Sequence, residues 1–98
     1  MLCNAKLEGA YMRFSNLKKA DLSGANLQGA DLRKAVLKKA IFDETTNLLG
    51  GKVDNANWFD NLTRNDCIGV EDVNVRYQVA QRPTEPPIFI VEQKVIEG

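Results

Sequence analysis

The sequence predicts a mainly β fold, in which residues 1–50 form a coiled solenoid of about two turns and residues 51–98 form a small α+β capping and hairpin module. Three observations support this prediction. A large apolar residue recurs at every fifth position, a small residue precedes it by two positions, and the composition changes near the middle of the chain. A chain of 98 residues has room for one domain, or for a short solenoid with an appended module.

The repeat has a large and a small member. A period of five fits neither the 3.6 residues of a helical turn nor the two-residue alternation of a strand, so the chain has to turn once per repeat. We expect both sets to point inward as the structural core. The large members are Leu2, Leu7, Met12, Leu17, Leu22, Leu27, Leu32, Leu37 and Phe42, and the small members are Ala5, Ala10, Ser15, Ala20, Ala25, Ala30, Ala35 and Ala40.

The turn is expected two residues after each large member. Residues two apart in an extended segment share a face, so each small residue points the same way as the large residue after it. One corner near a right angle per repeat then closes a square coil after four repeats. Gly9, Gly24 and Gly29 stand where a tight corner is expected. Lys19 and Lys34 occupy the same slot, so the corner does not require glycine.

The run Ala-Asp-Leu-Ser-Gly, Ala-Asn-Leu-Gln-Gly, Ala-Asp-Leu-Arg-Lys over residues 20–34 resembles the pentapeptide-repeat family. The resemblance extends over roughly residues 2–44 and implies a right-handed quadrilateral β-helix. Family members that protect DNA gyrase mimic the acidic surface of DNA and are much longer. This chain has a basic coil and about two turns, so we do not expect that activity.

Both ends of the repeat need an explanation. The repeat begins at Leu2 with no helix before it, so we expect either a truncated chain or an open coil end on which another chain stacks. At the other end, the register is expected to stop at Phe42, Asp43 and Glu44, and the turn-rich residues 47–51 to lead out of the coil.

The C-terminal module is expected to contain short helices and a hairpin. Residues 55–63 predict a helix with Asn55 as its N-cap, and residues 69–76 a second helix, although their valines also suit a strand. Residues 77–81 and 88–96 predict an antiparallel hairpin that packs on the helices or on the coil end. The order Trp58, Leu62, Gly69, Tyr77, Val79 is similar to C-terminal modules of some cyanobacterial pentapeptide-repeat proteins.

The composition argues against an enzyme. The chain has no histidine, and Cys3 and Cys67 lie too far apart in sequence for a metal or redox motif. We therefore expect no catalytic residue, no metal and no cofactor, and reduced thiols in a cytoplasmic protein. No apolar run approaches the roughly 20 residues of a membrane span, and the N-terminus lacks a signal-peptide pattern, so we expect no membrane partner.

The carboxylates are expected to be structural. Asp21 and Asp31 lie ten residues apart, on opposite sides of the square, and their slot also accepts Asn. Asp43, Glu44 and Asp54 could bind a hard cation, but carboxylates at the exit of a solenoid are usually solvated.

Charge and exposed apolar residues indicate binding surfaces. Residues 1–50 carry eight basic and five acidic side chains, and residues 51–98 the reverse. Stacking residues twenty apart collects seven positive charges on two adjoining sides. Four apolar residues are expected to point outward, with Val36 and Ile41 covered by the C-terminal module and Tyr11 and Phe14 free to contact a partner. The seven basic residues are Arg13, Lys18, Lys19, Arg33, Lys34, Lys38 and Lys39.

Three functions follow from these patterns. The first is a non-enzymatic scaffold or interaction module that binds another protein, or itself as a homodimer, through the open N-terminal coil. The second is a basic element that binds nucleic acid or another polyanion, although its basic face lacks interleaved aromatic residues. An enzyme is the weakest of the three.

Overall fold

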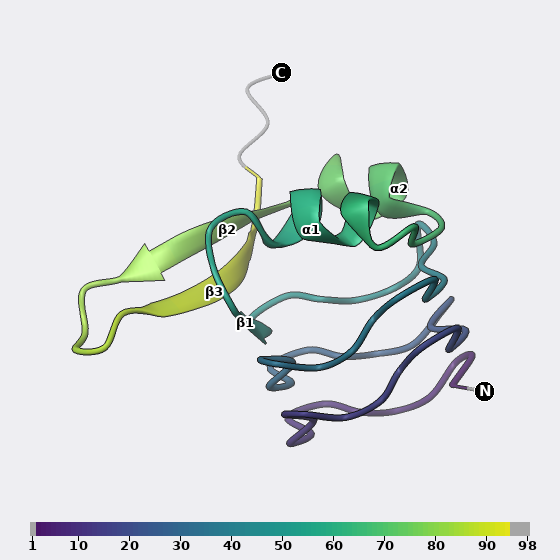
Figure 1. The fold of residues 1–98 in the computed structure, drawn as a ribbon, viewed down its shortest axis with the longest axis horizontal. Coiled ribbons are helices and arrows are strands. Elements are labelled where there is room, and N and C mark those ends of the chain that lie inside the picture. Colours follow the sequence, from purple (N-terminus) through teal and green to yellow (C-terminus); the bar gives the residue numbers. More distant parts are fainter. Residues whose placement is uncertain (1, 95–98) are drawn as a thin grey trace.

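The computed structural model describes residues 2–94, which form a coiled segment, a layer of short helices and a small sheet (Figure 1). The N-terminal segment winds through stacked turns. Helices α1 (Trp58–Arg64) and α2 (Val70–Asn74) lie across one end of this stack. Strands β2 (Tyr77–Arg82) and β3 (Ile88–Gln93) form a hairpin that projects to one side. The short strand β1 (Lys52–Val53) lies where the coil and the hairpin meet.

Successive turns of the coil are joined by parallel bridges between residues twenty apart. Lys6 pairs with Asn26, and three further bridges repeat this spacing. In each of these bridges, the backbone N–H of the residue on the upper turn donates a hydrogen bond to the lower turn, and its carbonyl accepts one from the lower turn. The N–H of Asn26 donates to the carbonyl of Ala5 at 2.9 Å, and the N–H of Leu7 donates to the carbonyl of Asn26 at 2.8 Å. Residues twenty apart therefore lie side by side. The further bridges are Tyr11–Asp31, Asn16–Val36 and Asp21–Ile41.

Each corner is made by a residue with a positive φ, two positions after the large apolar residue. This slot holds three glycines and five other residues, so residues other than glycine also adopt the positive φ of the corner. The preceding Asn or Asp shapes the corner, because its side chain accepts a hydrogen bond from the N–H two residues later, as Asn26 does from Gln28 at 3.1 Å. The corner residues are Asn4, Gly9, Phe14, Lys19, Gly24, Gly29, Lys34 and Lys39.

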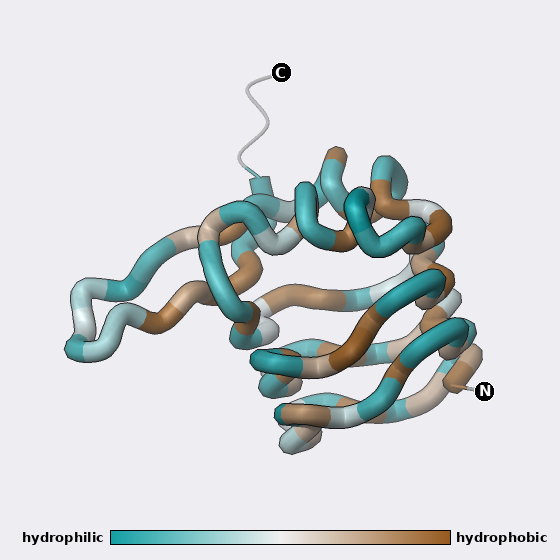
Figure 2. Tube along the Cα trace, in the orientation of Figure 1, coloured by the Kyte–Doolittle hydropathy of each residue, from teal (hydrophilic) through white to brown (hydrophobic). Residues whose placement is uncertain are grey.

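The inward residues form one core that continues into the helical layer. The large members from Met12 to Phe42 are buried, whereas Leu2 and Leu7, nearest the N-terminal end, are only half-buried. Among the small members, Ala25, Ala30 and Ala40 are buried, and Ala5, Ala10, Ala20 and Ala35 are half-buried. Figure 2 shows apolar positions recurring along each turn. Trp58 and Leu62 of α1, Val73 of α2 and Val91 of β3 extend the same core.

The expectation that the repeat stops at Phe42 was wrong. Asn47 forms a parallel bridge with Asn26, and Lys52 forms one with Asp31, so the coil continues after a one-residue insertion. Leu48 and Val53 take the large inward slots and are buried, as is Thr46 in the small slot. The insertion is accommodated at one corner, where Asp43 Oδ1 accepts hydrogen bonds from the N–H groups of Gly24 and Thr45. These contacts replace the regular backbone pairing.

Both predicted helices are present with shifted bounds, and α2 ends at Asn74 rather than at residue 76. Helix α1 begins at Trp58 rather than at residue 55, and its N-cap is Asn57. The Asn55 side chain instead accepts the N–H of Asn57 at 3.0 Å, forming the turn that leads into the helix. In α2, Val70 and Val73 are buried whereas Val75, which follows the helix, is 64% exposed.

The predicted hairpin is present, and a third strand joins it. Strands β2 and β3 pair antiparallel with Val79 opposite Val91, while residues 95 and 96 of the predicted strand lie outside the described residues. The sheet order is β1-β3-β2, because Val53 pairs with Phe89. Since Lys52 also bridges Asp31, strand β1 belongs both to the coil and to the sheet. This double pairing attaches the hairpin to the coil.

Candidate interaction surfaces

The N-terminal turn of the coil carries an edge of unpaired backbone groups. The N–H and C=O groups of Lys6, Tyr11 and Asn16 have no hydrogen-bond partner among residues 2–94. One turn further along, the equivalent groups of Asn26 and Asp31 bond to the turn beneath them. The first turn therefore presents the pairing pattern of an edge strand, which is a template for another chain.

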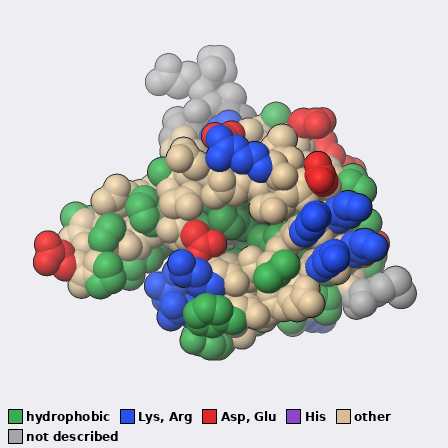
Figure 3. All heavy atoms as spheres, in the orientation of Figure 1, with side chains coloured by type: hydrophobic (Ala, Val, Ile, Leu, Met, Phe, Trp, Pro, Cys, Tyr) green, Lys and Arg blue, Asp and Glu red, His purple; other side chains and the backbone are tan. Residues whose placement is uncertain are grey.

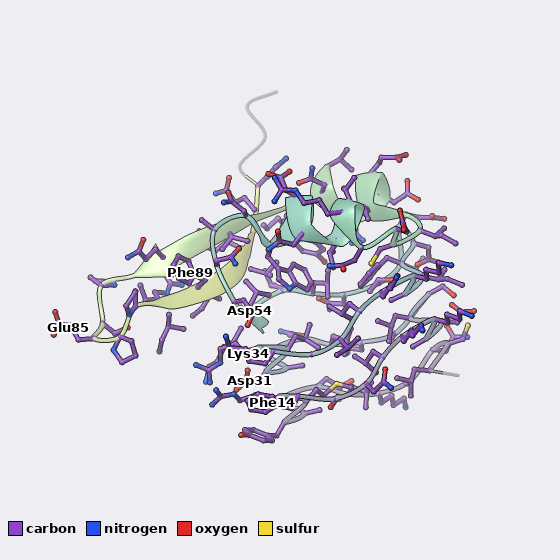
Figure 4. All side chains as sticks on the ribbon, in the orientation of Figure 1. Phe14, Asp31, Lys34, Asp54, Glu85 and Phe89 are labelled. Atoms are coloured by element: carbon purple, nitrogen blue, oxygen red, sulfur yellow. The ribbon has the colours of Figure 1, made fainter. Side chains whose placement is uncertain are left out.

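Two exposed aromatic residues lie on this turn, where they were expected. Tyr11 is 75% exposed and Phe14 is 70% exposed. The Arg13 guanidinium lies 5.6 Å from the centre of the Phe14 ring, within the range of a cation–π contact. Arg13 Nε is buried without a hydrogen-bond partner in the described structure. Figure 4 shows Phe14 on the same side of the coil as Asp31, Lys34 and Asp54.

The other two outward apolar residues differ from each other. Ile41 is half-buried and is bridged by Ile68 of the C-terminal module, as expected. Val36 is 49% exposed, so the expectation that the C-terminal module covers it was wrong. The reason is that no described residue bridges Val36 from above, because the chain enters α1 on that side instead of adding another extended segment.

The carboxylates Asp21 and Asp31 make local contacts within their own turns of the coil. Asp31 is 8% exposed and forms a two-pronged ion pair with Arg33, with 2.7 Å between Oδ2 and Nη2. The hydrogen bonds from Arg33 lower the pKa of Asp31, and the same carboxylate raises the pKa of Arg33. The Ser23 hydroxyl and N–H donate to Asp21 and lower its pKa. These groups have structural partners and are not arranged as an acid and base pair.

The seven basic residues separate into two groups at two corners. Phe14 and Arg33 are joined by a backbone hydrogen bond, which places Arg13, Arg33 and Lys34 at one corner. At the other corner, the N–H of Lys19 donates to the carbonyl of Lys38 at 2.9 Å. The lysines of this second group are all exposed and have no ion pair with any residue from 2 to 94. We call them the lysine column: Lys18, Lys19, Lys38 and Lys39.

The lysine column continues into the C-terminal module, which the sequence did not indicate. The N–H of Lys39 donates to the carbonyl of Asn65 at 2.9 Å, and Asp66 adopts the corner conformation with φ 59°. Residues 65–68 therefore form another level of the coil, with Ile68 bridging Ile41. The Cys67 thiol donates to the carbonyl of Leu37 at 3.0 Å, and burial raises its pKa. This level places Asp66 next to Lys39, at one end of the lysine column.

Arg76 also has a role that the sequence does not indicate. Its Nη2 donates to the carbonyls of Asp43 and Thr46, at 3.3 and 2.9 Å, and its Nη1 lies 3.1 Å from the Tyr77 hydroxyl. The guanidinium also lies 4.8 Å from the centre of the Tyr77 ring. Arg76 therefore ties the insertion loop of the coil to the start of β2. The slip in the five-residue register indicates an inserted loop whose carbonyls need new donors, but it does not indicate which residue supplies them.

Two of the three acidic residues considered for a cation, Asp43 and Asp54, have other roles. Asp43 caps the corner at Gly24, while Asp54 Oδ1 accepts the N–H of Lys34 at 2.7 Å. Between residues 2 and 94 there is no group of three or more side chains placed to hold a metal ion. Within the same range, no helix is long and apolar enough to cross a membrane.

Five-residue repeats that stack into coils, with one corner per repeat, define a solenoid repeat protein. Residues 2–33 and 20–57 match the family described as Pentapeptide repeats, with eight copies. These ranges include more than half of the chain, so the chain belongs to the pentapeptide-repeat family. No curated protein and no solved structure matches it.

Proposed function

We propose that this protein is a non-enzymatic scaffold that binds protein along the edges of a right-handed quadrilateral β-helix, whose coils continue past Phe42. The unpaired backbone edge at Lys6, Tyr11 and Asn16 carries this proposal. An edge of this kind pairs with another chain through main-chain hydrogen bonds, and exposed aromatic residues beside it supply apolar contact area. A second copy of the chain, forming a homodimer, is the partner whose edge has the same repeat spacing.

Several features support a binding role over a catalytic one. The carboxylates Asp21, Asp31, Asp43 and Asp54 each accept hydrogen bonds that shape or cap corners of the coil. On the N-terminal turn, the exposed rings of Tyr11 and Phe14 lie beside the unpaired backbone groups and supply contact area for a partner. A cytoplasmic setting, in which the thiols stay reduced, fits this proposal.

The test is the oligomeric state of a variant with a charged edge. Tyr11→Lys and Phe14→Lys together place lysine in slots where the chain already carries it, at Lys6 and at Lys19, so the coil should fold. Sedimentation velocity should show the wild type associating as its concentration rises, and the double variant remaining a monomer. Val36→Lys is the matched control, one turn away in the Tyr11 slot, and should associate as the wild type does. A wild type that stays monomeric at high micromolar concentration would count against the proposal.

A second candidate function is the binding of nucleic acid or another polyanion by the lysine column. Its four exposed lysines without ion pairs among residues 2–94 favour this candidate, since clustered positive charge attracts phosphate groups. The test compares wild type with a variant that carries Glu at all four positions, using single-stranded DNA and heparin as probes. Binding that is weak in the wild type, or unchanged in the variant, would remove this candidate.

A further inference from the structure

One column of the coil is a level shorter than the other three. Three bridge columns reach a third level, which Asn47, Lys52 and Ile68 supply above Asn26, Asp31 and Ile41. The fourth column pairs Asn16 with Val36 and ends there among the described residues. Helix α1 crosses above this column in place of an extended segment (Figure 1).

The missing level leaves two backbone groups with unused pairing capacity. In the neighbouring column, the N–H of Leu32 donates to the carbonyl of Lys52, and the N–H of Lys52 donates to the carbonyl of Ala30, each at 2.9 Å. The equivalent groups above Val36 are the N–H of Leu37 and the C=O of Ala35. Neither has a hydrogen-bond partner in the described part of the chain. Together they match one residue of an added parallel strand.

These two groups border a groove of about 310 Å³ between the coil and α1. Ala35 and Leu37 line it from the coil, and Trp58, Asn61 and Leu62 line it from the helix. Figure 3 shows the hollow below the helical layer on the face nearest the viewer. Because Trp58 and Leu62 already fill the core behind it, an added strand has room only for small side chains pointing inward.

Charge gives the groove a direction. Arg64 lines the groove and precedes Asn65, whose carbonyl accepts the N–H of Lys39. Lys38, Lys39 and Arg64 are exposed, and none of the three has an ion pair with a residue in the range 2–94. Asp54 lines the groove as well, and its carboxylate is bonded to the N–H of Lys34, at the other corner. A strand parallel to residues 35–37 runs from the Asp54 end toward the lysines. Acidic residues at its C-terminal end would therefore meet Arg64, Lys38 and Lys39, with Asp66 in the corner level next to Lys39.

We propose that this groove binds a short, extended, acidic segment of a partner protein, which completes the missing level of the coil. One residue of the segment donates its N–H to the carbonyl of Ala35 and accepts the N–H of Leu37. The residues on either side of it are small. Residues 65–68 already occupy the level above the next corner, so the acidic residues that follow turn outward there and contact the side chains of Lys38, Lys39 and Arg64. The groove recognises the segment by main-chain pairing, by side-chain size and by charge.

This inference rests on the proposed function, because it keeps binding at a coil edge and assigns a second edge and a class of partner to it. The two can fail separately. Variants of Tyr11 and Phe14 test the first edge through the oligomeric state, whereas the groove is tested by peptide binding. A chain that self-associates without binding the peptide would overturn the groove alone.

The experiment uses the full chain and the capped peptide Gly-Ala-Asp-Ala-Glu-Glu as its probe. Binding with a Kd on the order of 0.1–1 mM is expected, as is usual for a short flexible segment. Hydrogen exchange followed by NMR should show the Leu37 amide slowed about tenfold at saturation, because that N–H gains a partner. The same peptide methylated on the nitrogen of its Asp should not bind, since it lacks the N–H that pairs with Ala35.

A matched pair of variants tests the charge. Lys38→Glu with Lys39→Glu reverses the charges beside the groove and should weaken binding about fivefold or more, while Lys18→Glu with Lys19→Glu, one turn lower in the same column, should have little effect. The proposal is overturned by equal losses in both variants, by equal competition from single-stranded DNA, or by no peptide binding at millimolar concentration. Protection of Leu37 that rises with protein concentration alone would also overturn it, because a second copy would then fill the groove.

Discussion

Gly69 packs directly against the backbone carbonyl of Phe42, and a Cβ added to Gly69 would overlap that oxygen. The contact lies where the chain leaves residues 65–68, the extra level of the coil, and enters α2 with a φ of 79°. Glycine is needed here for two reasons, the backbone conformation and the close approach. It is therefore a junction residue between the coil and the helical layer.

Gly69→Ala should lower the free energy of unfolding by more than about 3 kcal/mol, because the clash adds to the cost of a positive φ. Gly9→Ala is the matched control, since Gly9 has a φ of 66° and an added Cβ meets nothing within 4 Å. The control should lose only about 1 kcal/mol. Urea denaturation followed by circular dichroism measures both. Equal losses in the two variants would show that the Phe42 contact is unimportant.

Val36→Asn should stabilise the coil. Asn in this slot accepts the N–H two residues later, as Asn16 does from Lys18 at 3.1 Å, and Val36 cannot form this bond. The expected gain is about 0.5–1 kcal/mol, or a few degrees in Tm. Val36→Ala controls for the loss of the branched side chain at this half-exposed site. A Tm for Val36→Asn at or below that of Val36→Ala would contradict the proposed role of the Asn/Asp slot.

The period of five was enough to predict the inward residues, the stacking of residues twenty apart and the corner positions. Each of these three features depends on a local geometry that is the same in every repeat, so an irregular residue in one repeat does not change the prediction for the others. The one-residue insertion within residues 43–46 interrupts this repetition. The sequence register ends at Phe42, yet the chain rejoins the coil at Asn47, because Asp43 supplies the hydrogen bonds that a regular corner would have made.

The exposed edge of Val36 and the clamp at Arg76 could not be predicted for a different reason. Both depend on which segments of the C-terminal module reach the top of the coil. Residues 65–68 add an extended level above Ile41, whereas α1 crosses above the Asn16–Val36 column without pairing with it and leaves Val36 exposed. No repeat encodes that choice. It follows from the packing of Trp58 and Leu62 into the open end of the core.

Arg76→Lys should destabilise the protein although it keeps the positive charge. The planar guanidinium reaches two carbonyls of the insertion loop and the Tyr77 hydroxyl at once, and a lysine ammonium cannot match that geometry. A loss of about 1.5–3 kcal/mol in the free energy of unfolding is expected. Arg82→Lys, in the more exposed ion pair with Glu92, is the control and should change stability by less than about 0.5 kcal/mol. Similar effects at both positions would argue against a clamp at Arg76.

Asp43 should make stability depend on acidic pH. Hydrogen bonds from Thr45, Gly24 and Thr46 lower the pKa of Asp43 below its ordinary value of 3.8, with the Thr45 hydroxyl contributing most. A carboxyl whose pKa is depressed in the folded state stabilises the protein above its unfolded pKa, and this contribution is lost as pH falls through the folded pKa. Wild type should therefore be more stable than Asp43→Asn at pH 7, and the difference in Tm should shrink below about pH 4. Asp60→Asn, at an exposed position on α1, is the control and should show a small difference at every pH. A difference in Tm between wild type and Asp43→Asn that stays constant from neutral to acidic pH would contradict this role. The loss of stability would then come from the shape of the amide and not from its missing charge.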